Sequence, residues 1–211
     1  MPEPRYQRRK EQRPAEIAEA ALAEFAENGY SATRVGDVAS RAGVSKGLLY
    51  LYYKTKEDLF KAVIRNFVAP KITRLSGQLD HSTQSSEAFL RGPFLTFIKS
   101  LPGSPAQILI RLMIAEGPRH PDLTRYYLQN VVEPGLATLR KLVQRGVDRG
   151  EFRATALTEF PQLIMSPVLF ALLWKLIFDA QQELDVDRLL ESHIDILVNH
   201  LQATESAGGK S

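Results

Sequence analysis

The chain has 211 residues, no cysteine and a formal net charge of +3 at pH 7. That length suffices for one large domain or two modest ones with a real core. The lack of cysteine excludes disulfides and thiolate metal sites, and it fits a reducing cytoplasm. The charged N-terminal residues lack the apolar stretch of a signal peptide, and the longest apolar run, 163–178, is too short to span a bilayer. We therefore expect a cytoplasmic protein without a membrane segment.

The basic surplus lies at the N-terminal end. Residues 1–56 hold ten Lys and Arg against seven Asp and Glu, whereas residues 57–211 hold 17 of each. We call residues 1–56 the head. A basic segment of this kind is typical of a protein that binds nucleic acid. We expect a disordered arm at the start of this head, which either follows the DNA backbone or is a solvated basic tail. Its cationic residues are Arg5, Arg8, Arg9, Lys10 and Arg13.

Clusters of Pro and Gly divide the chain into segments with helical spacing of apolar residues, and none shows the alternation of a strand. The sequence therefore predicts an all-α fold of about nine helices. The expected helices are 15–28, 35–42, 46–52, 56–78, 87–100, 105–117, 122–149, 156–180 and 185–203. Pro134, Pro161 and Pro167 should kink or interrupt the later segments, because proline removes a helix hydrogen bond and crowds the preceding turn.

Residues 33–59 predict a helix-turn-helix. Thr33 is suited to cap a first short helix, Gly43 supplies the tight turn, and Ser45 is suited to cap a second short helix whose Leu49 and Tyr53 face inward. The remaining side chains of the second helix present a cation, hydroxyls and small backbone surface that suit a major groove. Thr55 and Asp58 have the spacing of a capping box for a third helix.

The predicted DNA contacts include Lys54 and Lys56, whose ammonium groups flank that cap and could meet phosphates. The full set is Thr33, Ser45, Lys46, Gly47, Leu48, Tyr50, Leu51, Tyr52, Lys54 and Lys56.

These residues resemble the tetracycline-repressor (TetR) family of bacterial transcription regulators. The stretch IAEAALAEFAENGYSATRVGDVASRAGVSKGLLYLYYKTKEDLF, from Ile17 onward, follows the family's pattern of Phe-x-x-x-Gly, then Thr-x-x-x-Asp-Val-Ala, then Gly-Val-Ser-x-Gly-x-Leu-Tyr-x-Tyr-Tyr-x-x-Lys. The match covers about the first quarter of the chain. Gly36 departs from it, since the family usually has a larger residue there. By this resemblance, Lys46 contacts a base or the groove, and Tyr50 and Tyr52 contact phosphates.

Apolar and aromatic residues gather in the segments after residue 87. An effector pocket is mostly apolar with a few polar anchors, although such residues most often simply pack in a core. The predicted ligand contacts are Phe94, Phe97, Met113, Tyr126, Phe170 and Trp174. Arg111, Glu116 and His120 are polar candidates. The resemblance implies that these helices enclose the pocket and that the last two, rich in leucine and isoleucine, pair with their two-fold mates as a four-helix bundle.

The four histidines are scattered without metal spacing, and no nucleophile, phosphate-loop or cofactor motif occurs. We expect no enzyme, no metal and no cofactor. The leading hypothesis is a homodimeric repressor that operator DNA and a small-molecule effector both bind, with residues 1–56 on DNA, 57–203 for ligand and dimer, and 204–211 as a disordered tail. The alternatives are a helical ligand-binding protein with a vestigial DNA-binding head, and an enzyme built on the same helices.

Overall fold

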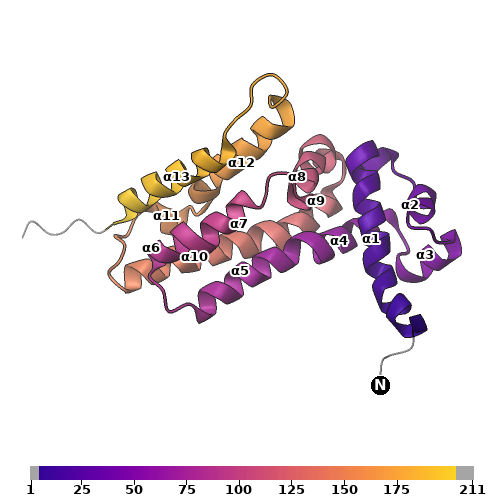
Figure 1. Ribbon diagram of the computed structural model, residues 1–211, viewed down its shortest axis with the longest axis horizontal. Coiled ribbons are helices and arrows are strands. Elements are labelled where there is room, and N and C mark those ends of the chain that lie inside the picture. The colour runs from indigo at the N-terminus through magenta and orange to yellow at the C-terminus, as the bar shows by residue number, and fades with distance from the viewer. Residues whose placement is uncertain (1–4, 203–211) are drawn as a thin grey trace, which may run out of the picture. The chain divides into compact units, whose positions relative to one another are not determined.

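The computed structural model of the protein describes residues 5–202, with side chains from residue 13 onward. Within this range the regular structure is helical apart from an isolated antiparallel bridge between Phe152 and Gln202 (Figure 1). The predicted all-α fold is confirmed. No helix in the described part of the chain has the length and apolarity needed to cross a membrane. The predicted tail, 204–211, lies outside the described residues.

The α-helices have the following bounds: α1 (Arg5–Ala32), α2 (Val35–Arg41), α3 (Lys46–Tyr52), α4 (Lys56–Val63), α5 (Ala69–His81), α6 (Ser86–Phe89), α7 (Leu95–Lys99), α8 (Pro105–Glu116), α9 (Pro121–Tyr127), α10 (Glu133–Asp148), α11 (Ala156–Glu159), α12 (Gln162–Ile177) and α13 (Val186–Leu201).

Helix α1 is longer than predicted at both ends. It begins at Arg5, so the residues expected to form a disordered arm are helical from that point on. Arg, Lys, Glu and Gln dominate this stretch and are good helix formers, which explains the extension. Near its other end, Gly29 adopts a φ of 75° and a ψ of 172°, which kinks the helix before its last residues. The side chains of the arm up to residue 12 lie outside the described range.

Three predicted long helices contain a π-helical turn next to a proline. The turns are Ile64–Val68, Leu90–Phe94 and Leu128–Val132; Pro93 lies inside the second turn, and Pro70 and Pro134 follow the other two. A wider turn accommodates both the missing N–H and the crowding of the proline ring. In two of the turns an asparagine side chain donates to the carbonyl four residues back, Asn66 to Ala62 at 2.8 Å and Asn130 to Tyr126 at 2.9 Å.

The chain forms two compact units. The first holds the described residues up to Pro70 together with Pro105–Val132, and the second holds Lys71–Ser104 and the residues from Glu133 on. Neither boundary falls at residue 56, so the predicted functional division there remains a prediction.

The first unit contains the helix-turn-helix. Its core includes a cluster of three rings, Phe25, Tyr30 and Phe60, with centroids 5.5 to 6.3 Å apart. These rings join α1 to α4, and α2 and α8 also pack on α1. Helix α3 packs beside α2 (Figure 1).

In the second unit α13 packs on α12 and α7 (Figure 1). Surface ion pairs also connect α13 to the turn Leu90–Phe94 and to α7: Arg91 pairs with Asp195, and Lys99 pairs with Glu191. The apolar face of α13 is buried within its own chain; its buried residues are Val186, Leu190, Ile194, Leu197, Val198 and Leu201. Exposed large apolar side chains of this unit lie mainly on α12: Leu163, Leu169, Phe170 and Ile177. On α13, Ile196 is also exposed.

Candidate nucleic-acid interface

Helices α2 and α3 form the predicted helix-turn-helix. Gly43, with a φ of 64°, makes the turn between them. The Ser45 hydroxyl caps α3 by accepting a hydrogen bond of 3.1 Å from the Leu48 N–H, as its position predicted. Leu49 and Tyr53 point into the core, being 0% and 6% exposed. The buried side of α3 is therefore fixed, and its other side is free for a partner.

An arginine that sequence reasoning did not single out holds α2 against α1. The Arg41 guanidinium donates from Nε to Glu24 at 2.6 Å and from both terminal nitrogens to the two oxygens of Glu27. The hydrogen bonds from Arg41 lower the pKa of the Glu27 carboxyl, so it stays ionised. Such a forked pair fixes orientation as well as distance. The position of the helix-turn-helix on α1 follows from these contacts.

The outward face of α3 consists of Lys46, Gly47, Tyr50, Leu51 and, just beyond the helix end, Lys54. Tyr50 is 44% exposed and Leu51 74% exposed. Leu48 and Tyr52 are half-buried beside this face. Two cations and a phenol hydroxyl on one exposed surface can meet phosphates and base edges.

Gly36 allows the Lys46 side chain to lie across α2. A Cβ on Gly36 would stand 2.6 Å from Cε of Lys46 and 3.0 Å from its Nζ. The residue that departs from the family pattern therefore provides room for the lysine at the start of α3. A larger residue at position 36 would push this flexible side chain elsewhere.

Two predicted DNA contacts, Thr33 and Lys56, also make hydrogen bonds inside the protein. Thr33 is 2% exposed, and its hydroxyl donates to the carbonyl of Gly29 at 2.6 Å; it does not cap α2, whose N-cap is Arg34. Lys56 donates to the carbonyls of Ser31 and Thr33 at 2.9 and 3.1 Å. Both side chains bond to carbonyls at the end of α1, and their contact with DNA remains a prediction.

The start of α4 agrees with prediction. The Thr55 hydroxyl accepts from the Asp58 N–H at 3.1 Å, and the Asp58 carboxylate accepts from the Thr55 N–H at 3.0 Å, which completes the capping box. Asp58 also accepts from the N–H of Lys54 at 3.1 Å. The loop that follows α3 is thus fixed while the Lys54 side chain stays exposed.

The polar residues predicted as effector anchors lie on α8 and the turn after it, and they contact the end of α1. The Glu116 carboxylate accepts from the N–H groups of Tyr30 and Ser31 and from the Ser31 hydroxyl, and His120 Nε2 lies 3.1 Å from the same hydroxyl. Arg111 donates to the carbonyl of Ala26. These contacts connect α8 and the turn after it to the kinked end of α1. The role of Arg111, Glu116 and His120 as polar candidates for an effector remains a prediction.

Burial and hydrogen bonds shift the pKa values of Glu116 and Lys56 at the end of α1. Burial raises the pKa of Glu116, but its hydrogen bonds from Ser31 and Tyr30 outweigh that effect and the pKa is lowered. Burial lowers the pKa of Lys56, with the negative charge of Glu116 acting in the opposite direction. The Lys56 ammonium also lies 4.6 Å from the centroid of the Tyr30 ring. We call Tyr30, Ser31, Lys56, Glu116 and His120 the α1 junction.

The predicted effector contacts belong to different units. Met113 and Tyr126 are half-buried in the first unit, where the Tyr126 ring lies 5.4 Å from the Lys61 ammonium. In the second unit Phe94, only 1% exposed, contacts Phe97 with ring centroids 6.5 Å apart. Phe170 and Trp174 are paired on α12 at 5.8 Å, and the Trp174 indole donates to the carbonyl of Gln182. Their role in ligand binding remains a prediction.

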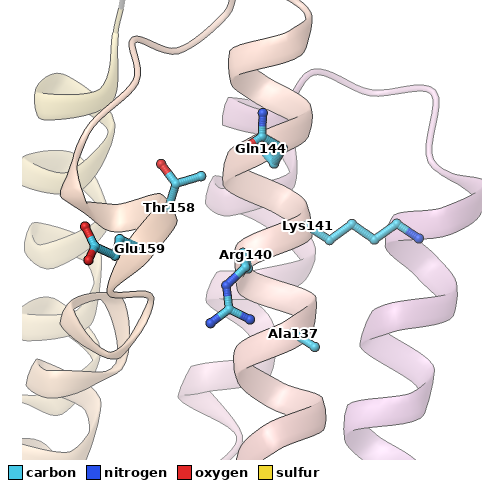
Figure 2. Close-up of a pocket in the computed structure, with 6 residues that line it drawn as sticks. All are labelled: Ala137, Arg140, Lys141, Gln144, Thr158 and Glu159. Atoms are coloured by element: carbon cyan, nitrogen blue, oxygen red, sulfur yellow. The ribbon is translucent and has the colours of Figure 1, made fainter.

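A pocket of about 600 Å³ lies between α10 and α11 (Figure 2). Its lining is Ala137, Arg140, Lys141, Gln144, Thr158 and Glu159. None of the predicted effector contacts is among these residues. Lys141 is also turned to Asp80 of α5, with which it forms an ion pair. This pocket does not take the place of the predicted effector site.

Two family profiles match the chain. The profile "Bacterial regulatory proteins, tetR family" matches residues 17–63, and "Tetracyclin repressor-like, C-terminal domain" matches residues 83–192, more than half of the chain. The first range contains the helix-turn-helix, and the second contains α8, whose Glu116 contacts the end of α1.

Curated relatives are similar along most of their length. The HTH-type transcriptional regulator YfiR of Bacillus subtilis is 26% identical over 198 residues, which cover 93% of this chain and 95% of that protein. The HTH-type transcriptional repressor KstR2 of Mycolicibacterium smegmatis is 32% identical over 142 residues, which cover 65% of this chain and 66% of that protein. Among solved structures, the regulator FadR of Bacillus subtilis in complex with stearoyl-CoA has the same fold, with a TM-score of 0.74 at 22% identity over 89% of this chain and 99% of that one.

Proposed function

The chain belongs to the TetR family of bacterial transcription regulators, and on that basis we propose that it is a cytoplasmic homodimeric repressor that binds operator DNA through α3. The observation that carries this proposal is the outward face of α3, where Lys46, Tyr50 and Lys54 are exposed on a helix whose other side is fixed in the core. A small apolar or amphipathic effector releases the repressor from DNA.

A second copy of the chain completes the DNA-binding unit. Recognition helices of a two-fold dimer enter successive major grooves when they stand about 34–36 Å apart, one turn of DNA. The exposed apolar surface of α12 supports such a dimer, because a monomer would leave Leu163, Leu169, Phe170 and Ile177 in water. The operator then consists of two inverted half-sites.

The alternative of a ligand-binding protein with a vestigial head is less well supported. A head that no longer binds DNA would have no reason to keep two lysines and a tyrosine exposed on α3. The family consists of regulators, which also argues against an enzyme built on the same helices. Fluorescence anisotropy with the DNA upstream of the gene separates the regulator from both alternatives.

We expect Lys46→Ala to weaken operator binding by about 1–3 kcal/mol per half-site, and Tyr50→Ala to weaken it by the loss of a phosphate contact, while both variants keep the fold because both side chains are exposed. Loss of a base contact should also relax sequence preference. Operator and random duplexes are titrated by anisotropy, and thermal unfolding checks the fold. Lys71→Ala, outside the helix-turn-helix, is the matched control. Wild-type affinity in both mutants would exclude α3 as the reading helix.

We expect an effector bound among the helices from 87 to 180 to lower operator affinity by shifting the 56–78 segment, which connects the head to the rest of the chain. A coupling of about 1–3 kcal/mol changes affinity by about 5 to 150-fold, and it must be reciprocal. Stearoyl-CoA is the first probe, because a protein of this fold binds it. Trp174, the single tryptophan, reports binding by fluorescence with and without operator. A ligand that binds equally well in both titrations is not the inducer.

A further inference from the structure

The exposed face of α3 has a polar row and an apolar row. Residues four apart lie one above the other on a helix, so Lys46 and Tyr50 form one row and Gly47 and Leu51 form the next. Leu51 is 74% exposed, the highest fraction among the large hydrophobic side chains in the described part of the chain. A leucine so exposed gains nothing from the fold of its own chain.

Gly47 is likewise unexplained by the fold. Its φ is not positive, and a Cβ built on it would meet nothing nearer than the Ser45 hydroxyl at 4.0 Å. Glycine in a helix is less favourable than alanine, so the isolated protein would be more stable with a side chain here. The absence of a side chain matters only if something outside the chain approaches this position closely.

We call the exposed row of Gly47 and Leu51 the apolar notch, because no atom lies within 4 Å of the position where a side chain of Gly47 would begin except the Ser45 hydroxyl. Long side chains on a helix point back over the preceding turn, which directs Leu51 toward the open space above Gly47. Helix α3, with the sequence KGLLYLY, carries no Asn, Gln or Arg that could make a paired contact with adenine or guanine. The one apolar feature that the major groove offers is the C5-methyl group of thymine.

We propose that Leu51 is a specificity-determining residue that reads the methyl group of a thymine in each operator half-site, with Gly47 admitting that methyl. This inference rests on the proposed function, since it requires α3 to lie in the major groove. Lys46 and Tyr50 then contact the neighbouring base edge and phosphate from the polar row, and the thymine gives the half-site its apolar contact.

Substitution of deoxyuridine for thymine tests the proposal, because it removes the methyl group and keeps every hydrogen-bonding group. The full-length protein first selects a duplex from a random library, and each thymine of that duplex is then replaced in turn. We expect one position per half-site to lose about fourfold in affinity, the equivalent of about 0.8 kcal/mol for one buried methyl group, and about 15-fold when both half-sites are changed. The Leu51→Ala variant should bind the thymine and deoxyuridine duplexes equally.

Gly47→Ala provides an independent measurement. Its thermal midpoint should rise while its operator affinity falls, because the new methyl fills the notch. The matched control is Ile114→Ala, which shortens an exposed apolar residue of α8 and should keep the wild-type response to deoxyuridine. A stability loss in Gly47→Ala would mean that the fold itself requires the glycine, and would overturn its assigned role.

The outcomes separate this inference from the proposed function. If no duplex is selected and binding to all DNA is equally weak, the proposed function as a DNA-binding regulator is wrong. If a duplex is selected but no deoxyuridine changes its affinity, only the methyl contact is wrong. If deoxyuridine weakens wild type and Leu51→Ala to the same extent, the methyl group is read by another residue or through the shape of the DNA, and Leu51 is not the reader.

Discussion

The Phe170→Glu variant is expected to be a folded monomer that has lost specific operator binding. Phe170 lies seven residues from both Leu163 and Ile177 on α12, so the three share one face, and they are 52%, 52% and 58% exposed. If this face forms the two-fold dimer interface, the carboxylate introduced at position 170 lies in the middle of the interface without a cationic partner. The dimer buries two such carboxylates. Burying such a charge costs several kcal/mol.

The effect on DNA binding follows from the loss of the second recognition helix. Two linked contacts bind more tightly than one by about 10²–10⁴-fold, and a monomer loses that factor. Sedimentation velocity at several concentrations measures the fraction of dimer. Circular dichroism measures the helix content, and fluorescence anisotropy measures the operator affinity. The experiment also separates this role of Phe170 from its predicted effector contact, because loss of an effector contact alone leaves the dimer intact.

Two control variants make the result specific. Ile114→Glu places the same charge on an exposed apolar position of α8 and should remain dimeric. Leu197→Glu should unfold rather than dissociate, because Leu197 is only 5% exposed within its own chain. A Phe170→Glu protein that is dimeric at every concentration would remove α12 from the dimer interface.

The Glu116→Ala variant should lose about 3 kcal/mol of stability at neutral pH and should also bind operator more weakly. The Glu116 carboxylate accepts three hydrogen bonds from Tyr30 and Ser31, and hydrogen bonds to a charged group contribute about 1.5–3 kcal/mol each before exposure reduces them. Without it, two backbone N–H groups at the kink of α1 lack their acceptor. Lys56, bonded to the carbonyls of the same segment, would lose its position at the start of α4.

The pH dependence has a defined direction. Because the pKa of Glu116 in the folded protein is lower than its ordinary value of 4.5, the carboxylate stabilises the fold above that pH, and the contribution is lost as the pH falls through the folded value. The difference in melting temperature between wild type and Glu116→Gln should therefore shrink below pH 4.5. Asp122→Ala, which removes an exposed carboxylate paired with exposed Arg125, is the control and should melt like wild type. Equal melting of Glu116→Ala and wild type at pH 7 would show that the α1 junction does not stabilise the head.

Most contacts between residues close in sequence were predictable; the exception is Thr33, whose hydroxyl bonds to the Gly29 carbonyl and does not cap α2. The turn at Gly43, the cap at Ser45 and the capping box of Thr55 with Asp58 each depend on residues within about four positions of one another, and all three are present. The irregular turn before Pro134 was also predictable, because proline acts on the turn that precedes it. The motifs of the stretch from Ile17 to Phe60 also indicated the TetR family.

Burial and polar pairing were decided by the tertiary structure. Periodicity marked an apolar face on both of the last helices, but only packing shows that the face of α13 is covered by its own chain while the stripe on α12 stays exposed. Lys56 has the sequence context of a phosphate contact, yet it bonds to Ser31, 25 residues away. Glu116 was predicted to anchor an effector, yet its partners Tyr30 and Ser31 lie 86 and 85 residues before it. The sequence by itself determined the all-helical fold and the helix-turn-helix, because those depend on neighbours along the chain, whereas the π-helical turns that divide three expected helices were found only in the structure. Which polar groups satisfy one another was set only when folding brought distant segments into contact.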